Sequence, residues 1–162
     1  MKRKLIYLIA LFLLMLISGV FWGTWFALTR SLEAFTSGEF IHIGKVIINN
    51  VGIWMRILMP LTIIMMILSL WYYRYKRSTG FYLGLASFVL IIISLLITLI
   101  FMVPIDRQII QWTNATVPPQ WEYIRDQWKL FHALRTLSTL ASFGCFSWCI
   151  LAAMKKNKTA NY

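Results

Sequence analysis

A histidine and an arginine stand three residues apart at the start of an apolar run. His132 and Arg135 lie in the segment DQWKLFHALRTL (126–137), which leads directly into STLASFGCFSWCILAAM. Residues three apart in a helix share a face. A histidine can act as a general base near neutral pH, and an arginine can hold an enolate, a phenolate or a carboxylate. The pair therefore predicts a site that removes a proton and stabilises the resulting anion.

A second set of polar residues recurs every seven positions in the first half of the chain. His42, Asn49 and Arg56 are seven apart, and they share one stripe of a helix because seven residues make nearly two turns. A charge within a membrane span is costly unless it is paired or reaches the interface. Arg56 is therefore the strongest single signal in this stripe, and Asn49 could orient the carbonyl of a ligand.

The C-terminal half carries a matching stripe, because Trp121, Trp128 and Arg135 are also seven apart. We expect both stripes to reach the same depth and to share one pocket. The two arginines would be separated there by Asp106, Glu33 or Glu39, by an anionic ligand or lipid headgroup, or by water. The alternative is an ordinary membrane interface, where arginines reach lipid phosphates and tryptophans form a belt. The expected catalytic residues are His132, Arg135 and Arg56, and the expected ligand-binding residues are Asn49, Trp128, Asp106, His42 and Trp121.

Metal and nucleophile chemistry find little support in the sequence. Two histidines from different helices could ligate a metal or haem, but no pattern of supporting residues accompanies them. No Ser-His-Asp order and no phosphate-binding loop appears. The sequence therefore predicts neither a metal nor a cofactor.

The elements that must position these residues follow from the composition. Hydrophobic residues make up 60% of the 162 residues and charged residues 13%, against about half and a quarter in a soluble domain. Four apolar segments are long enough to cross a ~30 Å hydrocarbon core as helices: residues 5–28, 51–73, 81–103 and 133–154. The sequence predicts an all-α fold, a polytopic membrane four-helix bundle that forms a single domain.

The distribution of charge predicts the orientation of this bundle. The net charge of +11 suggests nucleic acid until the charges are placed. The basic residues at the N-terminus, in the link 74–77 and at the C-terminus have no acidic companion, whereas all five acidic residues fall in the other two loops. This is the positive-inside pattern of a multi-pass protein of the cell membrane with both termini in the cytoplasm. We therefore expect the lipid bilayer as a partner and no nucleic acid.

Local signals set the expected helix ends. The start KRK followed by an apolar run is similar to a signal peptide, but no convincing cleavage site follows, so we expect a retained first helix. The second helix should begin well before residue 51, since only glycines interrupt this stretch, and Pro60 should kink it. Pro104 should end the third helix, and the fourth should begin near Pro119 and run unbroken into the membrane.

Small residues four apart mark the expected packing faces, because they let helix backbones approach closely. The two cysteines are one turn apart and in register with two alanines, so we interpret them as packing residues rather than as a redox pair. The three sets are Gly19, Gly23 and Ala27; Gly80 and Gly84; and Ala141, Cys145, Cys149 and Ala153.

Residues 101–140 resemble a known family. FMVPIDRQIIQW followed by VPPQWEYIRDQWKLFHALRTL is similar to the signature half of the anthrone-oxygenase-like family of small four-helix membrane proteins. That family shows a Pro-x-Asn after the third helix, then a tryptophan, and then an Asn or His three residues before an Arg. Pro104, Trp128, His132 and Arg135 match, while Asp106 stands where Asn is common.

The resemblance implies an activity as well as a fold. Characterised members are linked to the oxygenation of anthrones to anthraquinones without an obvious cofactor. Carried over to this chain, the resemblance implies that His132 takes a proton from an activated ring carbon. Arg135 and Arg56 would then stabilise the anion, and O₂ would react with it.

Three kinds of function compete at this point. The first is a membrane enzyme acting on a flat, apolar, ionisable small molecule in a closed pocket. The second is a binding or transport module for such a molecule or a lipid headgroup, with a pocket open to lipid or continuous through the membrane. The third is an accessory subunit whose polar stripe faces outward and meets a partner. A homo-oligomer is compatible with each.

Overall fold

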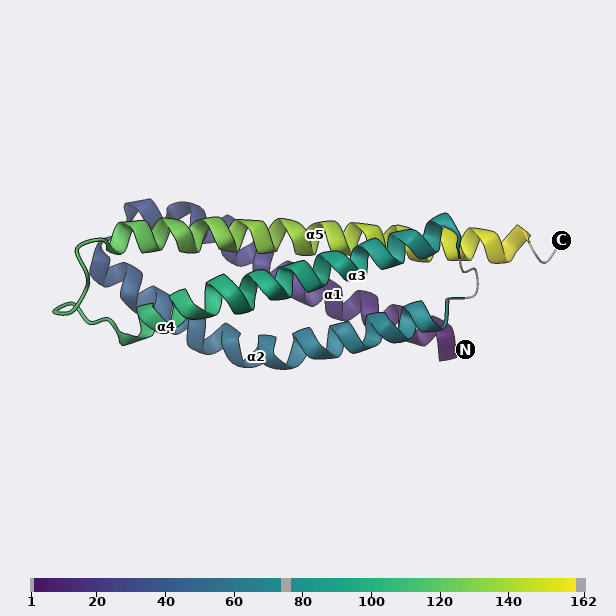
Figure 1. The fold of residues 1–162 in the computed structure, drawn as a ribbon, viewed down its shortest axis with the longest axis horizontal. Coiled ribbons are helices and arrows are strands. Elements are labelled where there is room, and N and C mark those ends of the chain that lie inside the picture. Colours follow the sequence, from purple (N-terminus) through teal and green to yellow (C-terminus); the bar gives the residue numbers. More distant parts are fainter. Residues whose placement is uncertain (1, 74–76, 160–162) are drawn as a thin grey trace.

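The computed structural model describes residues 2–73 and 77–159, and these form helices without any strand (Figure 1). The prediction of an all-α fold is confirmed. The elements in chain order are α1 (Lys2–Ala27), the 3₁₀ helix η1 (Thr29–Ala34), α2 (Ser37–Trp71), α3 (Thr79–Ile97), the π-helix η2 (Thr98–Met102), α4 (Val103–Gln111) and α5 (Trp121–Thr159).

Four of the helical stretches are long and apolar enough to cross a membrane, which confirms the multi-pass architecture. The 35 residues of α2 extend about 52 Å, so its ends project beyond a ~30 Å hydrocarbon core. The start of α1, the end of α2, the start of α3 and the end of α5 lie together at one end (Figure 1). The opposite end, called here the loop end, carries η1, α4 and residues 112–120. Arg74 and Lys76 of the predicted basic set lie outside the described residues.

Helix starts agree with the local signals. The second helix begins at Ser37, because Thr36 and Glu39 form a reciprocal cap: the Glu39 N–H donates to Thr36 Oγ1 at 3.4 Å, and the Thr36 N–H donates to Glu39 Oε2 at 2.8 Å. The helix continues through Pro60 and changes direction along its length (Figure 1). As predicted, the last helix begins in the loop, at Trp121, and runs unbroken.

The predicted end of the third helix is wrong. Pro104 lies in the first turn of α4, so the chain stays helical through η2 to Gln111. A proline lacks the N–H of an α-helical hydrogen bond, and just before it the backbone widens to a π-turn in which the Val103 N–H donates to the Thr98 carbonyl. Asp106 is therefore a helical residue that faces a neighbouring helix rather than a loop residue.

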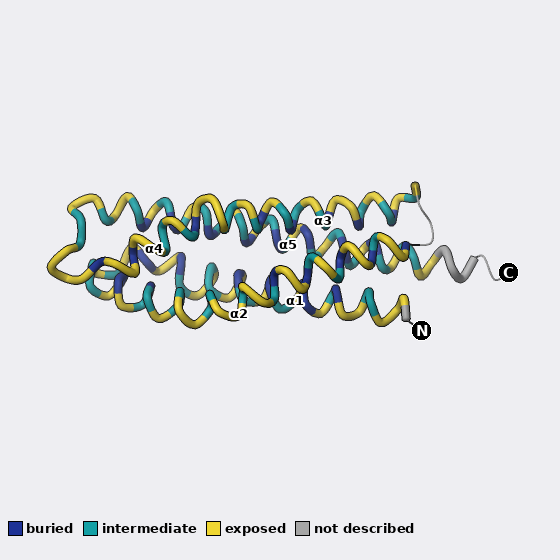
Figure 2. Tube along the Cα trace, turned by 60° about the horizontal axis from the view of Figure 1, so that its bottom comes forward, coloured by how far each residue is buried: buried dark blue, intermediate teal, exposed yellow. Residues whose placement is uncertain are grey.

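Each helix buries a narrow inner face and exposes a broad outer one, as the dark blue and yellow segments of Figure 2 show. Exposed leucine, isoleucine and phenylalanine side chains are expected where the surrounding medium is lipid. The central cluster of buried residues draws on four helices: Ala10, Leu14, Ile17 and Phe21 from α1, Met59 and Met66 from α2, Ile91 from α3 and Phe146 from α5.

Serines and threonines join α3 to α5 inside the bundle. The Ser87 and Ser142 hydroxyls lie 3.0 Å apart, and each also donates to the other's carbonyl, at 2.7 and 2.8 Å. Two turns away, the Ser94 hydroxyl lies 2.8 Å from that of Thr139. Such bonds hold helices together where lipid gives no hydrophobic drive for association. They fix the rotation of α5 that positions the site.

The prediction that small residues mark helix contacts is correct where α3 meets α5 and wrong for α1. A Cβ at Gly84 would lie 3.0 Å from Cys149 Sγ, and a Cβ at Gly80 would lie 3.1 Å from Ala152 Cβ. Cys149 is therefore a packing residue of the α3–α5 contact, as predicted. A Cβ built at Gly19 or Gly23 would meet no atom of a neighbouring element within 4 Å, and Ala27 is exposed, so this set marks no contact within the described chain and its prediction is wrong.

Candidate functional site

His132 lies at the centre of a polar cluster on the inner face of α5. Its side chain is fully buried, and its Nδ1 accepts a hydrogen bond of 2.9 Å from Arg135 Nε. Because Nδ1 is the acceptor, the neutral ring carries its proton on Nε2. That Nε2 is buried and has no hydrogen-bond partner within the described part of the chain. A buried donor left unpaired is costly, so this atom points to a ligand.

Aromatic rings enclose the imidazole on two sides. The Trp128 ring stacks on His132 with centroids 5.3 Å apart and planes at 26°. From α1, Phe21 meets His132 edge to face at 6.3 Å. The guanidinium carbon of Arg135 lies 4.4 Å from the centroid of the same Phe21 ring, a cation–π geometry. These contacts place an imidazole and a guanidinium between flat apolar surfaces.

Asp106 supports this cluster from α4. Its Oδ1 accepts a 2.9 Å hydrogen bond from the indole Nε1 of Trp128, which is 3% exposed. No ion pair of 4.0 Å or less joins Asp106 to Arg135. Asp106 therefore contacts the cluster through its hydrogen bond with Trp128, whose ring stacks on His132.

The sequence of α5 explains why these side chains share a face. Buried residues recur three or four positions apart along the helix, the spacing of one helical stripe: Arg125, Trp128, His132, Thr136, Thr139, Ser142, Phe146 and Cys149. The Thr136 hydroxyl donates to the His132 carbonyl at 2.7 Å. The residues of the site therefore lie on the same stripe of α5 whose serine and threonine hydroxyls bond to α3.

Arg56, Asn49 and His42 are not brought to this cluster. All three are exposed, and Arg56 Nε donates to the carbonyl of Gly52 on its own helix at 3.2 Å. The seven-residue spacing does place them on one stripe, but that stripe faces outward, because α2 buries the opposite side. In addition, α5 packs along its length on α3 and α1, whereas α2 packs on α1. The two polar stripes therefore do not share a pocket.

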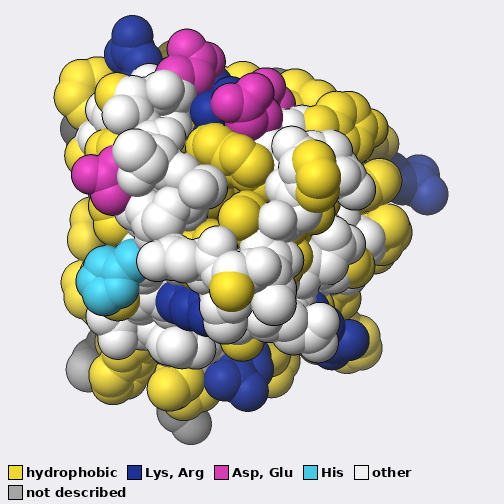
Figure 3. Space-filling model, turned by 90° about the vertical axis from the view of Figure 1, so that its left-hand side faces the viewer, with side chains coloured by type: hydrophobic (Ala, Val, Ile, Leu, Met, Phe, Trp, Pro, Cys, Tyr) yellow, Lys and Arg dark blue, Asp and Glu magenta, His cyan; other side chains and the backbone are white. Residues whose placement is uncertain are grey.

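Trp121 lies at the loop end, away from the imidazole. Its ring contacts Phe40 of α2 at 5.8 Å, and the Arg125 guanidinium carbon lies 5.2 Å from its centroid. Nearby, Lys129 forms an ion pair with Glu33 that ties α5 to η1. The loop end thus displays acidic and basic side chains around apolar ones (Figure 3).

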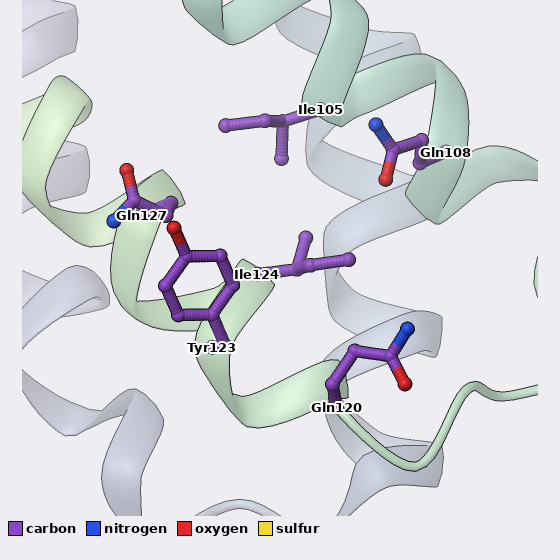
Figure 4. A pocket seen from close by; sticks show the side chains of 6 residues that line it. All are labelled: Ile105, Gln108, Gln120, Tyr123, Ile124 and Gln127. Atoms are coloured by element: carbon purple, nitrogen blue, oxygen red, sulfur yellow. The ribbon is translucent and has the colours of Figure 1, made fainter.

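A hollow of about 320 Å³ lies between α4 and α5 at the loop end. Ile105 and Gln108 of α4 face Tyr123, Ile124 and Gln127 of α5, with Gln120 at the margin (Figure 4). Its polar lining groups are neutral amides and a phenol. His132 and Arg135 do not line it, so the hollow is a separate feature from the imidazole cluster.

Two parts of the site escaped the sequence analysis. Phe21 was read as part of an unbroken apolar span, although it contacts both His132 and Arg135. The serines of α3 were not considered, although Ser87 and Ser94 stand seven apart in a very apolar segment. That spacing in a span was the available signal, because a hydroxyl in lipid must find a partner.

Comparison with known proteins agrees with the composition of this cluster. The family model described as anthrone oxygenase matches residues 54–145, a stretch that includes Asp106, Trp128, His132 and Arg135. No curated protein and no solved structure matches the chain. The chain is a multi-pass membrane protein that belongs to the anthrone oxygenase family.

Proposed function

We propose that this protein is a membrane enzyme that oxygenates an apolar, ionisable ring compound at His132 and Arg135. The observation that carries the proposal is the buried Nε2 of His132, which has no partner among the described residues. Family membership supports the reaction class, and the Trp128 and Phe21 rings packed around His132 give this atom an apolar setting that suits an apolar substrate.

The chemistry needs a site that stabilises negative charge on oxygen. A substrate whose CH₂ group is conjugated with a carbonyl loses a proton to hydroxide from the solvent to give an enolate, and the charge resides mainly on the oxygen. The hydroxide is regenerated when the peroxide formed with O₂ eliminates to the ketone. A neutral N–H at Nε2 and the charge of Arg135 suit such an oxygen in a water-poor setting. The enolate carbon then reacts with O₂, and the balanced overall change is R₂CH₂ + O₂ → R₂C=O + H₂O.

The role of His132 follows from its hydrogen bond with Arg135. While Nδ1 accepts from Arg135 Nε, the protonated Nε2 is a donor and cannot also take a proton. We therefore assign His132 first to binding the substrate oxygen. A general-base role would require the proton to leave Nε2 before the substrate binds.

The test uses the full chain purified in a mild detergent with an anthrone as substrate. We expect O₂ consumption and quinone formation in air, and neither under anaerobic conditions. The His132→Ala variant should lose about 100-fold in rate, as when an oxyanion donor is removed. Leu134→Ala, on the exposed side of the same helix, is the matched control and should react normally. Equal rates in both variants would remove His132 from the reaction.

Binding without chemistry is the second candidate, and the hollow between α4 and α5 favours it. The side chains of Gln108, Gln120 and Gln127 have no hydrogen bond to another described residue and remain available to a ligand. Under this alternative the anthrone would bind with the same affinity in air and without oxygen, and no quinone would form.

A further inference from the structure

The outward stripe of α2 leaves a charged residue that the proposed reaction does not use. Arg56 is exposed, and its neighbours Ile53, Trp54 and Ile57 are among the most exposed apolar side chains of the helix. No acidic side chain of the described residues lies within 4.0 Å of it. A cation on a lipid-facing surface needs a counter-charge from outside the chain.

The depth of Arg56 identifies where that counter-charge lies. Arg56 stands fifteen residues before Trp71, the exposed last residue of α2, and therefore about 22 Å along the helix from it. With Trp71 taken as the edge of a ~30 Å hydrocarbon core, about 8 Å remains between Arg56 and the boundary at the loop end. The side chain runs that way, because its Nε bonds to the Gly52 carbonyl one turn nearer the loop end. A long arginine side chain can carry its head to the interface from this depth.

The surface between Arg56 and Asn49 has the form of a notch. Gly52 follows Asn49 by three residues and precedes Arg56 by four, so the three share one face. Gly52 has no side chain, and a Cβ built there meets no atom within 4 Å. Asn49, which is exposed, lies about one turn nearer the loop end than Gly52, and Arg56 lies one turn on its other side with its Nε on the Gly52 carbonyl.

We propose that the notch formed by Asn49, Gly52 and Arg56 binds the phosphate of an anionic phospholipid in the leaflet at the loop end. A guanidinium and an amide N–H suit phosphate oxygens, and the exposed apolar neighbours suit the acyl chains. A second copy of the chain is a poorer occupant. A two-fold interface through this face would bring two Arg56 side chains together, and their like charges would repel.

The test measures lipid binding by native mass spectrometry of the full chain in mild detergent. Phosphatidylglycerol and diacylglycerol with identical acyl chains are the probes, since they differ by the phosphate headgroup. We expect phosphatidylglycerol to bind at least fivefold more tightly. Arg56→Ala should weaken this binding about fivefold, the effect of one basic residue at an anionic surface, and Arg56→Lys should retain most of it.

Two further variants separate lipid binding from folding. Gly52→Leu fills the notch without removing charge, and leucine is the better helix former, so it should weaken lipid binding while the helix remains intact by circular dichroism. Arg107→Ala removes an exposed arginine of α4 and should change binding less than twofold. Equal binding of both lipids, or equal losses from Arg56→Ala and Arg107→Ala, would overturn the proposal. So would a change from dimer to monomer mass in Arg56→Ala.

Discussion

At the scale of single residues, the bond from Arg135 to His132 decides which atom meets a ligand. The Nδ1 atom is occupied at 2.9 Å, and the buried Nε2 is left with its proton. A free histidine in the same place could turn either nitrogen toward a substrate. Arg135 therefore does two things: it supplies positive charge and it selects the tautomer of its neighbour.

Replacing His132 by glutamine tests whether Nε2 donates or accepts the proton. The glutamine amide keeps an oxygen for Arg135 and an N–H for the ligand, but it cannot act as a base. If His132 binds the substrate oxygen, His132→Gln should retain activity within about tenfold of the natural protein, while His132→Ala loses about 100-fold. Initial rates of O₂ consumption measure both. Equal losses in the two variants would assign His132 to proton removal instead.

The hydrogen bond between Trp128 and Asp106 makes a separate prediction. Trp128→Phe keeps a ring against His132 but loses the N–H that reaches Asp106 Oδ1, so the plane beside the imidazole becomes free to tilt. We expect kcat to fall about tenfold, the worth of a hydrogen bond to a charged group, with a smaller change in KM. Asp106→Asn keeps an acceptor oxygen and should stay within about threefold.

A readout that does not depend on activity accompanies this pair of variants. The chain contains two histidines, so ¹⁵N-labelled histidine gives an NMR spectrum in which the protonated ring nitrogen can be identified. We expect the Nε2–H form of His132 in the natural protein and in Asp106→Asn, and a mixture of forms in Trp128→Phe. A larger effect from Asp106→Asn than from Trp128→Phe would show that the charge matters more than the hydrogen bond.

At the scale of elements, the contact between α3 and α5 holds the site in place. Gly84→Leu would place a side chain whose Cβ alone lies 3.0 Å from Cys149 Sγ, so the rest of the leucine would collide with α5. Overpacking of this kind costs about 1–3 kcal/mol, so the midpoint of unfolding in a denaturing detergent should fall. Gly19→Leu is the matched control, because a Cβ built at Gly19 would meet no neighbouring atom within 4 Å. Destabilisation by Gly19→Leu as well would mean that this face of α1 is also packed.

Sequence patterns predicted where the helices begin better than they predicted which face of each helix points into the bundle. Stretches without a helix breaker, together with Pro119, located the starts of α2 and α5, because those signals are local. The spacing of His42, Asn49 and Arg56 placed them correctly on one stripe. It could not tell which way the stripe faces, since in lipid both sides of α2 are apolar and the choice depends on contacts between distant segments.

The region around Pro104 failed for a different reason. A proline predicts the end of a helix from its own missing N–H. Here the backbone accommodates Pro104 by widening to the π-turn of η2, and the chain continues as the helix α4 to Gln111. That accommodation brings Asp106 to Trp128. The resemblance placed Asp106, Trp128, His132 and Arg135 in the signature half of the family, but their mutual distances required the fold.

At the scale of the whole molecule, the arrangement of the helices separates two polar regions. The imidazole cluster lies inside, between α1, α4 and α5, and the notch of α2 lies on the lipid-facing surface. Counted along the helices, His132 lies eleven residues after the start of α5 and Asn49 lies twelve residues after the start of α2, and both helices start at the loop end. A ligand or lipid would therefore reach both regions from the same leaflet, and the orientation of the bundle decides which leaflet that is.

The charge pattern predicts that this leaflet is the outer one. The exposed basic residues Arg3, Lys4, Arg77 and Lys155 lie at the end with the termini, whereas the acids lie toward the loop end. Positive residues are retained on the cytoplasmic side, so a fluorescent protein fused to the C-terminus should fold and fluoresce. Alkaline phosphatase should be inactive at the C-terminus and active when inserted after Ala115, an exposed residue of the loop 112–120. The opposite pattern would place the imidazole cluster in the cytoplasmic leaflet, and its substrate would then have to come from inside the cell.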